Sequence, residues 1–268
     1  MRSLVYDNGS TRLVALHRVG RGRPILLLPG AMSDAAEWRS VAERLVPGRP
    51  VVVVNRRGRA PSGPLGPEYS VQTELDDLRA LMSRLDEKVD LVGWSYGGLI
   101  ALETAVRHPE EVHSVTAYEP IARPFAQDAV PALQAAVAAG DLDRAVELVN
   151  LRVSLYSIEH VAQLRGTRAW PALRALVAPA AAELAAVNDH HVDWKRYSTL
   201  SLPVALVEGA LNHGRQPYGP ALDMFVRALP QARVTTLPGQ GHLAHVHAPN
   251  ELAEHLNAAL SLDSPHAR

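Results

Sequence analysis

The chain has 268 residues, a length that suits one α/β domain, and 47% of them are hydrophobic, enough to bury a sizeable core. Its 27 basic and 28 acidic residues balance, so charge gives no reason to expect a nucleic acid or an anionic membrane as partner. Cysteine is absent, which excludes disulfides, thiolate nucleophiles and cysteine-ligated zinc.

The first predicted elements are a hairpin and two buried strands. Apolar residues flank the turn pair Asn8-Gly9, which is typical of a two-stranded hairpin. Continuous apolar runs at 25–28 and 51–54 predict strands that are buried on both faces. We expect a helix to begin after Ser33 or Asp34 as N-cap, and another over 70–85.

Strands and helices alternate through most of the remaining chain. The predicted strands are 89–92, 115–118, 203–207 and 233–237, and the helices are 99–107, 219–229 and one from about 249. This alternation implies parallel βαβ units with helices on both faces of the sheet. Residues 121–198 contain only alanine-rich helical segments. We therefore expect an α/β core formed by 1–120 and 199–268, with 121–198 inserted as a helical lid.

A serine lies at the junction between the predicted strand 89–92 and the helix 99–107. The segment Gly93-Trp94-Ser95-Tyr96-Gly97 has the pattern Gly-x-Ser-x-Gly. A strand, this pattern and a helix in succession form a nucleophile elbow, in which glycines permit a sharp, strained turn around the serine. Ser95 is therefore the candidate nucleophile.

A serine nucleophile needs a base, and His242 is the best candidate among the twelve histidines. It lies in a loop between the last strand and the last helix, where a late base is expected in this arrangement. His245 and His247 complete a His-x-x-His-x-His pattern that could be taken for a metal site. No upstream carboxylate motif accompanies the pattern, so we expect no metal.

The oxyanion that forms during attack on a carbonyl needs two converging backbone amides. One is expected from Tyr96, the residue after the nucleophile. The other is expected from Ala31, in the loop Pro29-Gly30-Ala31-Met32 that follows the strand 25–28.

These motifs resemble the α/β-hydrolase superfamily from about residue 10 to residue 260. The segment Asn55-Arg56-Arg57-Gly58-Arg59-Ala60-Pro61-Ser62 is similar to a superfamily loop that commonly reads Asp-x-Arg-Gly-x-Gly-x-Ser. One departure is Pro29-Gly30, where the superfamily usually has His-Gly, so a side-chain contact often found there is missing.

A second departure concerns the acid of the catalytic triad. The resemblance places an aspartate in a Gly-x-x-Asp turn after the strand 203–207, but this turn ends in Asn212, which carries no charge. Glu119 ends the strand that follows the nucleophile helix, at the same sheet edge as Ser95. Fungal zearalenone lactonases and certain haloalkane dehalogenases, which this chain resembles in that respect, take their acid from there. We predict a Ser95–His242–Glu119 triad, with Glu208 as the alternative acid.

The leading functional hypothesis is hydrolysis of an ester or lactone through an acyl-serine intermediate, with no metal or organic cofactor. The same triad supports acyl transfer, thioester cleavage and carbon–carbon bond hydrolysis. An alternative outside catalysis is a protein that binds a small apolar ligand on a hydrolase scaffold.

The apolar lid favours a small, apolar or aromatic substrate. We expect substrate contacts from Met32, Tyr156, Trp170 and Trp194. A cytoplasmic location is expected, because neither a signal-peptide pattern nor an apolar run of about 18–20 residues is found. The oligomeric state is left open.

Overall fold

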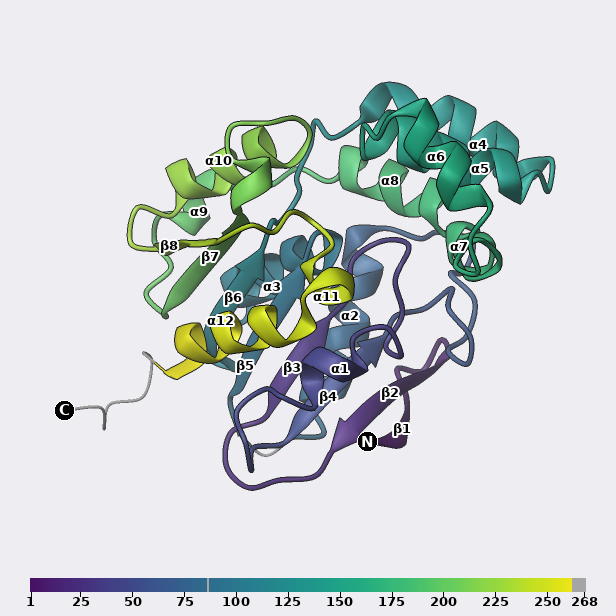
Figure 1. Ribbon diagram of the computed structural model, residues 1–268. Helices are drawn as coiled ribbons and strands as arrows, with labels where there is room; N and C mark the ends of the chain where they lie inside the picture. The colour runs from purple at the N-terminus through teal and green to yellow at the C-terminus, as the bar shows by residue number, and fades with distance from the viewer. Residues whose placement is uncertain (86, 262–268) are drawn as a thin grey trace.

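A mostly parallel sheet runs through the centre of the computed structural model, which describes residues 1–85 and 87–261 (Figure 1). Its eight strands lie in the order β1-β2-β4-β3-β5-β6-β7-β8. β1 and β2 form the predicted hairpin and pair antiparallel, and the strands from β4 to β8 in this order run parallel. The strands are β1 (Arg2–Asp7), β2 (Arg12–Arg18), β3 (Ile25–Leu28), β4 (Val51–Asn55), β5 (Val89–Trp94), β6 (Val112–Tyr118), β7 (Val204–Gly209) and β8 (Arg233–Leu237).

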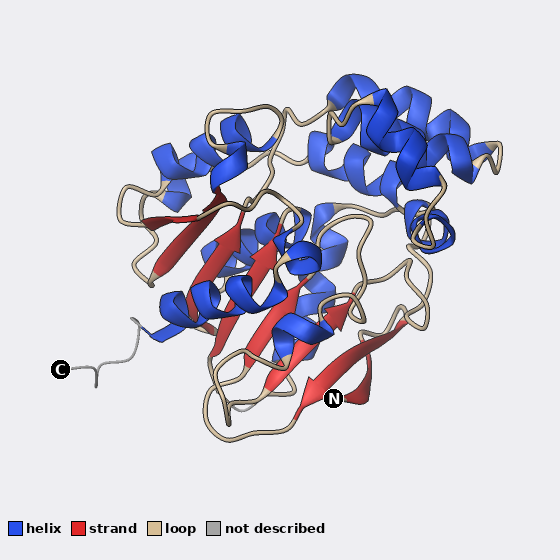
Figure 2. Ribbon diagram, viewed as in Figure 1, coloured by secondary structure: helices blue, strands red, loops and turns tan. Residues whose placement is uncertain are grey.

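Helices cover both faces of this sheet, which confirms the predicted fold class (Figure 2). The helices are α1 (Arg39–Ala42), α2 (Val71–Met82), α3 (Tyr96–Arg107), α4 (Val130–Ala138), α5 (Leu142–Leu148), α6 (Ile158–Arg165), α7 (Trp170–Val177), α8 (Ala180–Asp189), α9 (Trp194–Tyr197), α10 (Tyr218–Ala228), α11 (Ala244–His247) and α12 (Pro249–Ser261). Three further helical segments are η1 (Gln127–Ala129), η2 (Val149–Val153) and η3 (Ala210–Asn212).

The central strands are continuously apolar because successive side chains enter two different cores. Leu26 and Leu28 of β3 pack in a cluster with α2, α3 and α10. Ile25 and Leu27 point to the opposite face, where α1, α11 and α12 close a second cluster. Alternation of side chains across a strand thus turns an unbroken apolar run into two buried faces.

The helix expected after Ser33 or Asp34 begins later, so that prediction is wrong. Asp34 Oδ1 does accept from the Glu37 amide at 3.0 Å, as a capping residue would, but residues 35–38 form turns and α1 starts at Arg39. Ser33 instead accepts from the Trp38 indole at 3.1 Å and donates to the Glu37 carboxylate. The two side chains therefore stabilise a compact turn.

Helices α4 to α9 lie between β6 and β7, in a helical insertion comprising residues 121–198. Figure 1 shows α4 to α8 gathered above one edge of the sheet, whereas α9 lies beside α10. All of these residues are described, and they contain no strand. Residues 262–268 of the predicted core lie outside the described residues.

Within the described part of the chain, no single helix is long and apolar enough to cross a membrane. Helices α7 and α8 reach the necessary length and apolarity only together, as a pair bent by 49°.

A substitution at Gly97 tests how tightly the start of α3 packs against β3. A Cβ atom there would lie 2.1 Å from the Leu28 carbonyl oxygen, whereas at Gly166 the nearest atom would be 3.4 Å away. We expect Gly97→Ala to lower the free energy of unfolding by about 1–3 kcal/mol, although alanine is the better helix former. The control Gly166→Ala is expected to change it by no more than about 0.5 kcal/mol. Equal urea midpoints for the two variants would contradict this packing.

Candidate active site

Ser95 occupies a strained turn between β5 and α3. Its φ of 56° and ψ of −121° lie in a region that residues other than glycine rarely adopt. A Cβ atom at Gly93 would lie 2.3 Å from the Gly97 carbonyl oxygen, and one at Gly30 would lie 2.8 Å from Ser95 Cβ. The Ser95 amide donates to the Tyr118 carbonyl at 2.9 Å, which joins the turn to the end of β6. The glycines are therefore needed because backbone segments meet around the serine.

Glu119 follows directly after β6 and places a buried carboxylate beside His242. Its Oε2 lies 2.6 Å from His242 Nδ1, and the residue is only 1% exposed. The Gly209 amide donates to Oε1 at 2.8 Å, and Asn212 Nδ2 donates to both carboxylate oxygens at 2.9 Å. With these donors around it, the carboxylate favours a proton on His242 Nδ1, which leaves Nε2 free to act as a base.

The other two candidate acid positions do not contact His242. Asn212 contacts Glu119, so it holds the carboxylate instead of the imidazole. Glu208 Oε2 lies 2.8 Å from Nδ1 of His213, an exposed residue on the following turn. Of the three positions considered, only Glu119 is within hydrogen-bond distance of His242.

Aromatic residues fix the loop that carries His242. The Trp94 indole donates to the His242 carbonyl at 2.8 Å, and the Tyr118 hydroxyl donates to the Gly241 carbonyl. The Tyr218 ring stacks on the imidazole with ring centroids 3.5 Å apart and planes 11° from parallel. These contacts were not predicted, because an aromatic residue at a strand end or helix start has the same sequence signal as a core residue.

Burial lowers the pKa of His242 below its ordinary value of 6.5, while the hydrogen bond and charge of Glu119 raise it in part. The imidazole is therefore neutral at neutral pH, as a general base must be.

Ser95 and His242 line the same cavity, but their side chains are not joined by a hydrogen bond. Among the described contacts, Ser95 Oγ makes no hydrogen bond at all, so this atom is unpaired in the present conformation. Contacts between nucleophile and base are often long before substrate binds and shorten in the complex.

Ala31 and Tyr96, the predicted oxyanion donors, also line this cavity. Tyr96 is the first residue of α3, where an amide has no partner within the helix. Ala31 follows Gly30, whose backbone is pressed against Ser95, and precedes Met32, whose φ is 56°. Both amides therefore lie in backbone segments next to Ser95.

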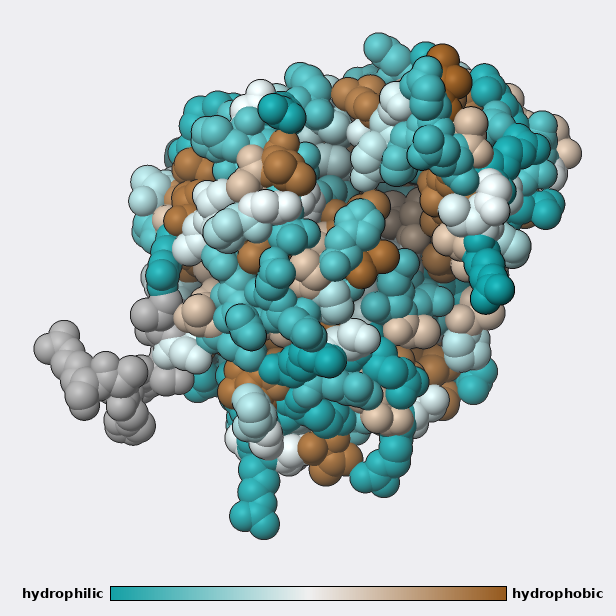
Figure 3. Space-filling view, in the orientation of Figure 1, coloured by the Kyte–Doolittle hydropathy of each residue, from teal (hydrophilic) through white to brown (hydrophobic). Residues whose placement is uncertain are grey.

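The cavity has a volume of about 330 Å³ and lies between the sheet edge and the helical insertion. Figure 3 shows a hollow there, with hydrophobic residues around it. Residues of the insertion form much of its apolar wall: Phe125, Leu133, Val149, Val153, Tyr156, Leu164, Leu173, Leu184 and Val187. The described residues that line it include no lysine or arginine.

The four predicted substrate contacts separate into two pairs. Met32 and Tyr156 line the cavity, but Trp170 and Trp194 do not. The Trp170 indole donates to Asp143 at 2.6 Å within the insertion, and Trp194 packs against Tyr197 and Phe225. Both tryptophans pack between helices and do not line the cavity, so they are not candidate substrate contacts. Helical spacing predicted buried side chains there but could not tell a cavity from a helix interface.

The chain is similar to known hydrolases along most of its length. A sequence model described as "Alpha/beta hydrolase family" matches residues 25–255. The chain is 29% identical to a pimeloyl-[acyl-carrier protein] methyl ester esterase of Aeromonas hydrophila over 251 residues, which cover 90% of this chain and 96% of that protein.

Solved structures share the fold. An alpha/beta hydrolase from Sphaerobacter thermophilus has a TM-score of 0.81 and 26% identity, covering 97% of this chain and 100% of the other. The enol-lactonase from Burkholderia xenovorans has a TM-score of 0.78 at 17% identity, covering 96% and 99% of the two chains, and shows likeness of fold alone. Since the family match extends over most of the sequence, the protein belongs to the alpha/beta hydrolase family.

Proposed function

We propose that this protein is a serine hydrolase that cleaves an ester or lactone bond of a small, uncharged and largely apolar substrate. The observation that carries the proposal is the 2.6 Å contact between the buried Glu119 carboxylate and His242 Nδ1, in a cavity that Ser95 also lines. Similarity to a methyl ester esterase over nearly the whole chain supports an ester as the bond that is cleaved.

The reaction proceeds through an acyl-serine intermediate. Ser95 Oγ attacks the carbonyl carbon while His242 Nε2 takes its proton, and Glu119 stabilises the resulting imidazolium. The amides of Ala31 and Tyr96 donate to the oxyanion. When the tetrahedral intermediate collapses, His242 returns the proton to the departing alcohol oxygen. His242 then takes a proton from a water molecule, whose oxygen attacks the acyl-serine carbonyl. As this second tetrahedral intermediate collapses, the bond to Ser95 Oγ breaks, His242 returns the proton to Oγ, and the carboxylic acid is released.

The cavity supports this choice of substrate class. Its volume of about 330 Å³ is near the lower end of the range of roughly 300–1,000 Å³ for ligand pockets. No lysine or arginine among the described lining residues would pair with an anionic substrate, and the wall is mainly apolar. In this proposal the helical insertion, residues 121–198, acts as a lid that shields the bound substrate from bulk solvent.

Exchange of the acid tests the proposed triad. We expect Glu119→Gln to lower kcat/KM for 4-nitrophenyl butyrate by about 10³–10⁴-fold, because an amide favours the wrong imidazole tautomer. Asn212→Ala removes both hydrogen bonds that this side chain donates to the carboxylate and should lower kcat/KM by about tenfold. As a control, Glu208→Gln makes the same change in another buried carboxylate and should stay within about threefold of wild type. Loss of turnover in Asn212→Ala but not in Glu119→Gln would show that the acid is wrongly assigned.

The lowered pKa of His242 predicts the pH dependence of the reaction. Turnover needs a neutral imidazole, so kcat/KM falls as the pH drops through this pKa. Because burial holds the pKa below 6.5, we expect the acid limb of the pH–rate profile to have its midpoint below that value. A pH–rate profile whose acid limb has its midpoint above 6.5 would contradict the observed environment of His242.

A further inference from the structure

Two buried arginines hold the loop that carries Ala31: Arg56, which makes the shorter bonds to Pro29 and Gly30, and Arg59, which donates to the Ser33 carbonyl at 2.6 Å and to the Gly30 carbonyl at 3.4 Å. Arg56 follows β4 and is only 2% exposed. Its Nε donates to the Pro29 carbonyl at 3.0 Å, and its Nη2 donates to the Gly30 carbonyl at 2.8 Å. Two consecutive carbonyl groups of the loop therefore point at one guanidinium.

The bond to the Gly30 carbonyl also sets the direction of the next amide. The peptide bond between Gly30 and Ala31 is trans, so its C=O and N–H groups point in opposite directions in one plane. With the carbonyl directed at Arg56, the Ala31 N–H must point to the opposite side of the loop. Rotating this peptide would break the 2.8 Å bond from Arg56 and the longer 3.4 Å bond from Arg59, and would leave a buried carbonyl without its donors.

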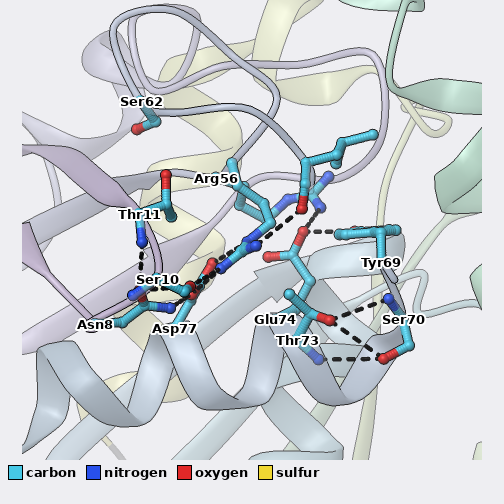
Figure 4. Close-up of polar contacts among 12 residues, drawn as sticks. Asn8, Ser10, Thr11, Arg56, Ser62, Tyr69, Ser70, Thr73, Glu74 and Asp77 are labelled. Atoms are coloured by element: carbon cyan, nitrogen blue, oxygen red, sulfur yellow. Dashed lines mark hydrogen bonds and ion pairs between the residues drawn. The ribbon is translucent and has the colours of Figure 1, made fainter. Parts of the chain in front are cut away.

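Two carboxylates from different parts of the fold hold Arg56 in place. Its Nη1 lies 2.7 Å from Glu74 of α2 and 2.8 Å from Glu183 of α8, which belongs to the helical insertion. Glu183 also receives two hydrogen bonds from Arg59, at 2.7 and 2.9 Å. Figure 4 shows Arg56 above Glu74, with Tyr69 beside that carboxylate. Two arginines and two glutamates thus balance in charge inside the protein.

The same cluster reaches the residue that supplies the second expected oxyanion amide. The Tyr69 hydroxyl bonds to Glu74 at 2.5 Å and to the Tyr96 hydroxyl at 3.1 Å. The Arg56 guanidinium lies over the Tyr96 ring, 4.8 Å from its centroid. The side chain at the start of α3 is therefore packed against the group that fixes the Ala31 loop.

We propose that Arg56 is a positioning residue that orients the Ala31 amide toward the oxyanion, and that Glu183 couples the docking of the helical insertion to this orientation. The proposal rests on the hydrolytic function proposed above. Arg56 thereby fixes the loop through its backbone carbonyls. This loop has Pro29-Gly30 at the position where the superfamily usually has His-Gly. Its neighbour Arg57 pairs instead with Asp77 of α2, at 2.6 and 2.7 Å.

These two neighbouring ion pairs offer a matched experiment. One double variant combines Arg56→Met with Glu74→Gln, and the other combines Arg57→Met with Asp77→Asn. Each double variant removes one buried arginine after β4 and neutralises one carboxylate of α2. We expect the first double variant to lower kcat for 4-nitrophenyl butyrate by about 10²–10³-fold while KM stays within about threefold. Its acid limb should not move, because Glu119 and His242 are untouched. The second should keep kcat within about threefold. Equal effects of the two exchanges, or a loss confined to KM, would overturn the proposal.

Two further measurements test the proposal if the first double variant does not fold or if the wild-type protein shows no esterase activity. If the first double variant does not fold, Glu183→Gln keeps the shape of the cluster and should lower kcat by about tenfold, so an unchanged kcat would overturn the coupling to the insertion. If the wild-type protein hydrolyses no ester, the proposed function fails, and a crystal structure of the first double variant still tests the geometry. We expect the Gly30 carbonyl to be rotated there, and an unrotated peptide would show that Arg56 does not set its direction.

Discussion

The Glu119 carboxylate is buried at the end of β6 and contacts donors from three other segments of the chain. They are the Gly209 amide at the end of β7, the Asn212 side chain on the turn after it, and the His242 ring on the loop after β8. Removing a carboxylate from water costs several kcal/mol unless such donors replace the lost solvent. The position of each of these segments relative to β6 is therefore constrained by one charged group.

This constraint explains the asparagine at position 212. An aspartate there would place a second carboxylate against Glu119, and two carboxylates that share a site cannot both stay ionised. Asparagine has nearly the same shape and donates two hydrogen bonds to the carboxylate. The glutamate at the end of β6 and the asparagine after β7 are thus one compensated arrangement, and in the proposed triad the acid follows β6 instead of β7.

Strained backbone gathers around the same site. Met32, Ser95 and Glu119 have φ values of 56°, 56° and 42°, although none of them is a glycine. Such conformations cost of order 1–3 kcal/mol each and persist only where the surrounding structure holds them. Here the supports are close backbone packing at the elbow, the Arg56 bonds to the loop before Met32, and the donors around Glu119.

The sequence predicted those features that have a local signal. Apolar runs such as 25–28 and 51–54 indicated strands because both of their faces are buried. Position relative to a strand end was enough to select Ser95, His242 and Glu119 as candidates. The role of Arg56 had no such signal, because its partners Glu74 and Glu183 lie far along the chain and their charges resemble those of exposed helix faces. Trp170 and Trp194 were placed at the cavity because helical spacing shows that a residue is buried but not against what.

The most direct test of this account is covalent labelling of the wild-type protein by a fluorophosphonate, followed by intact mass measurement and peptide mapping. If Ser95 is the nucleophile, we expect a single adduct, located on Ser95, and a parallel loss of ester turnover. Ser95→Ala should take up no label and should not hydrolyse the ester. An adduct on another residue, or undiminished turnover in Ser95→Ala, would contradict the assignment of Ser95 as the nucleophile.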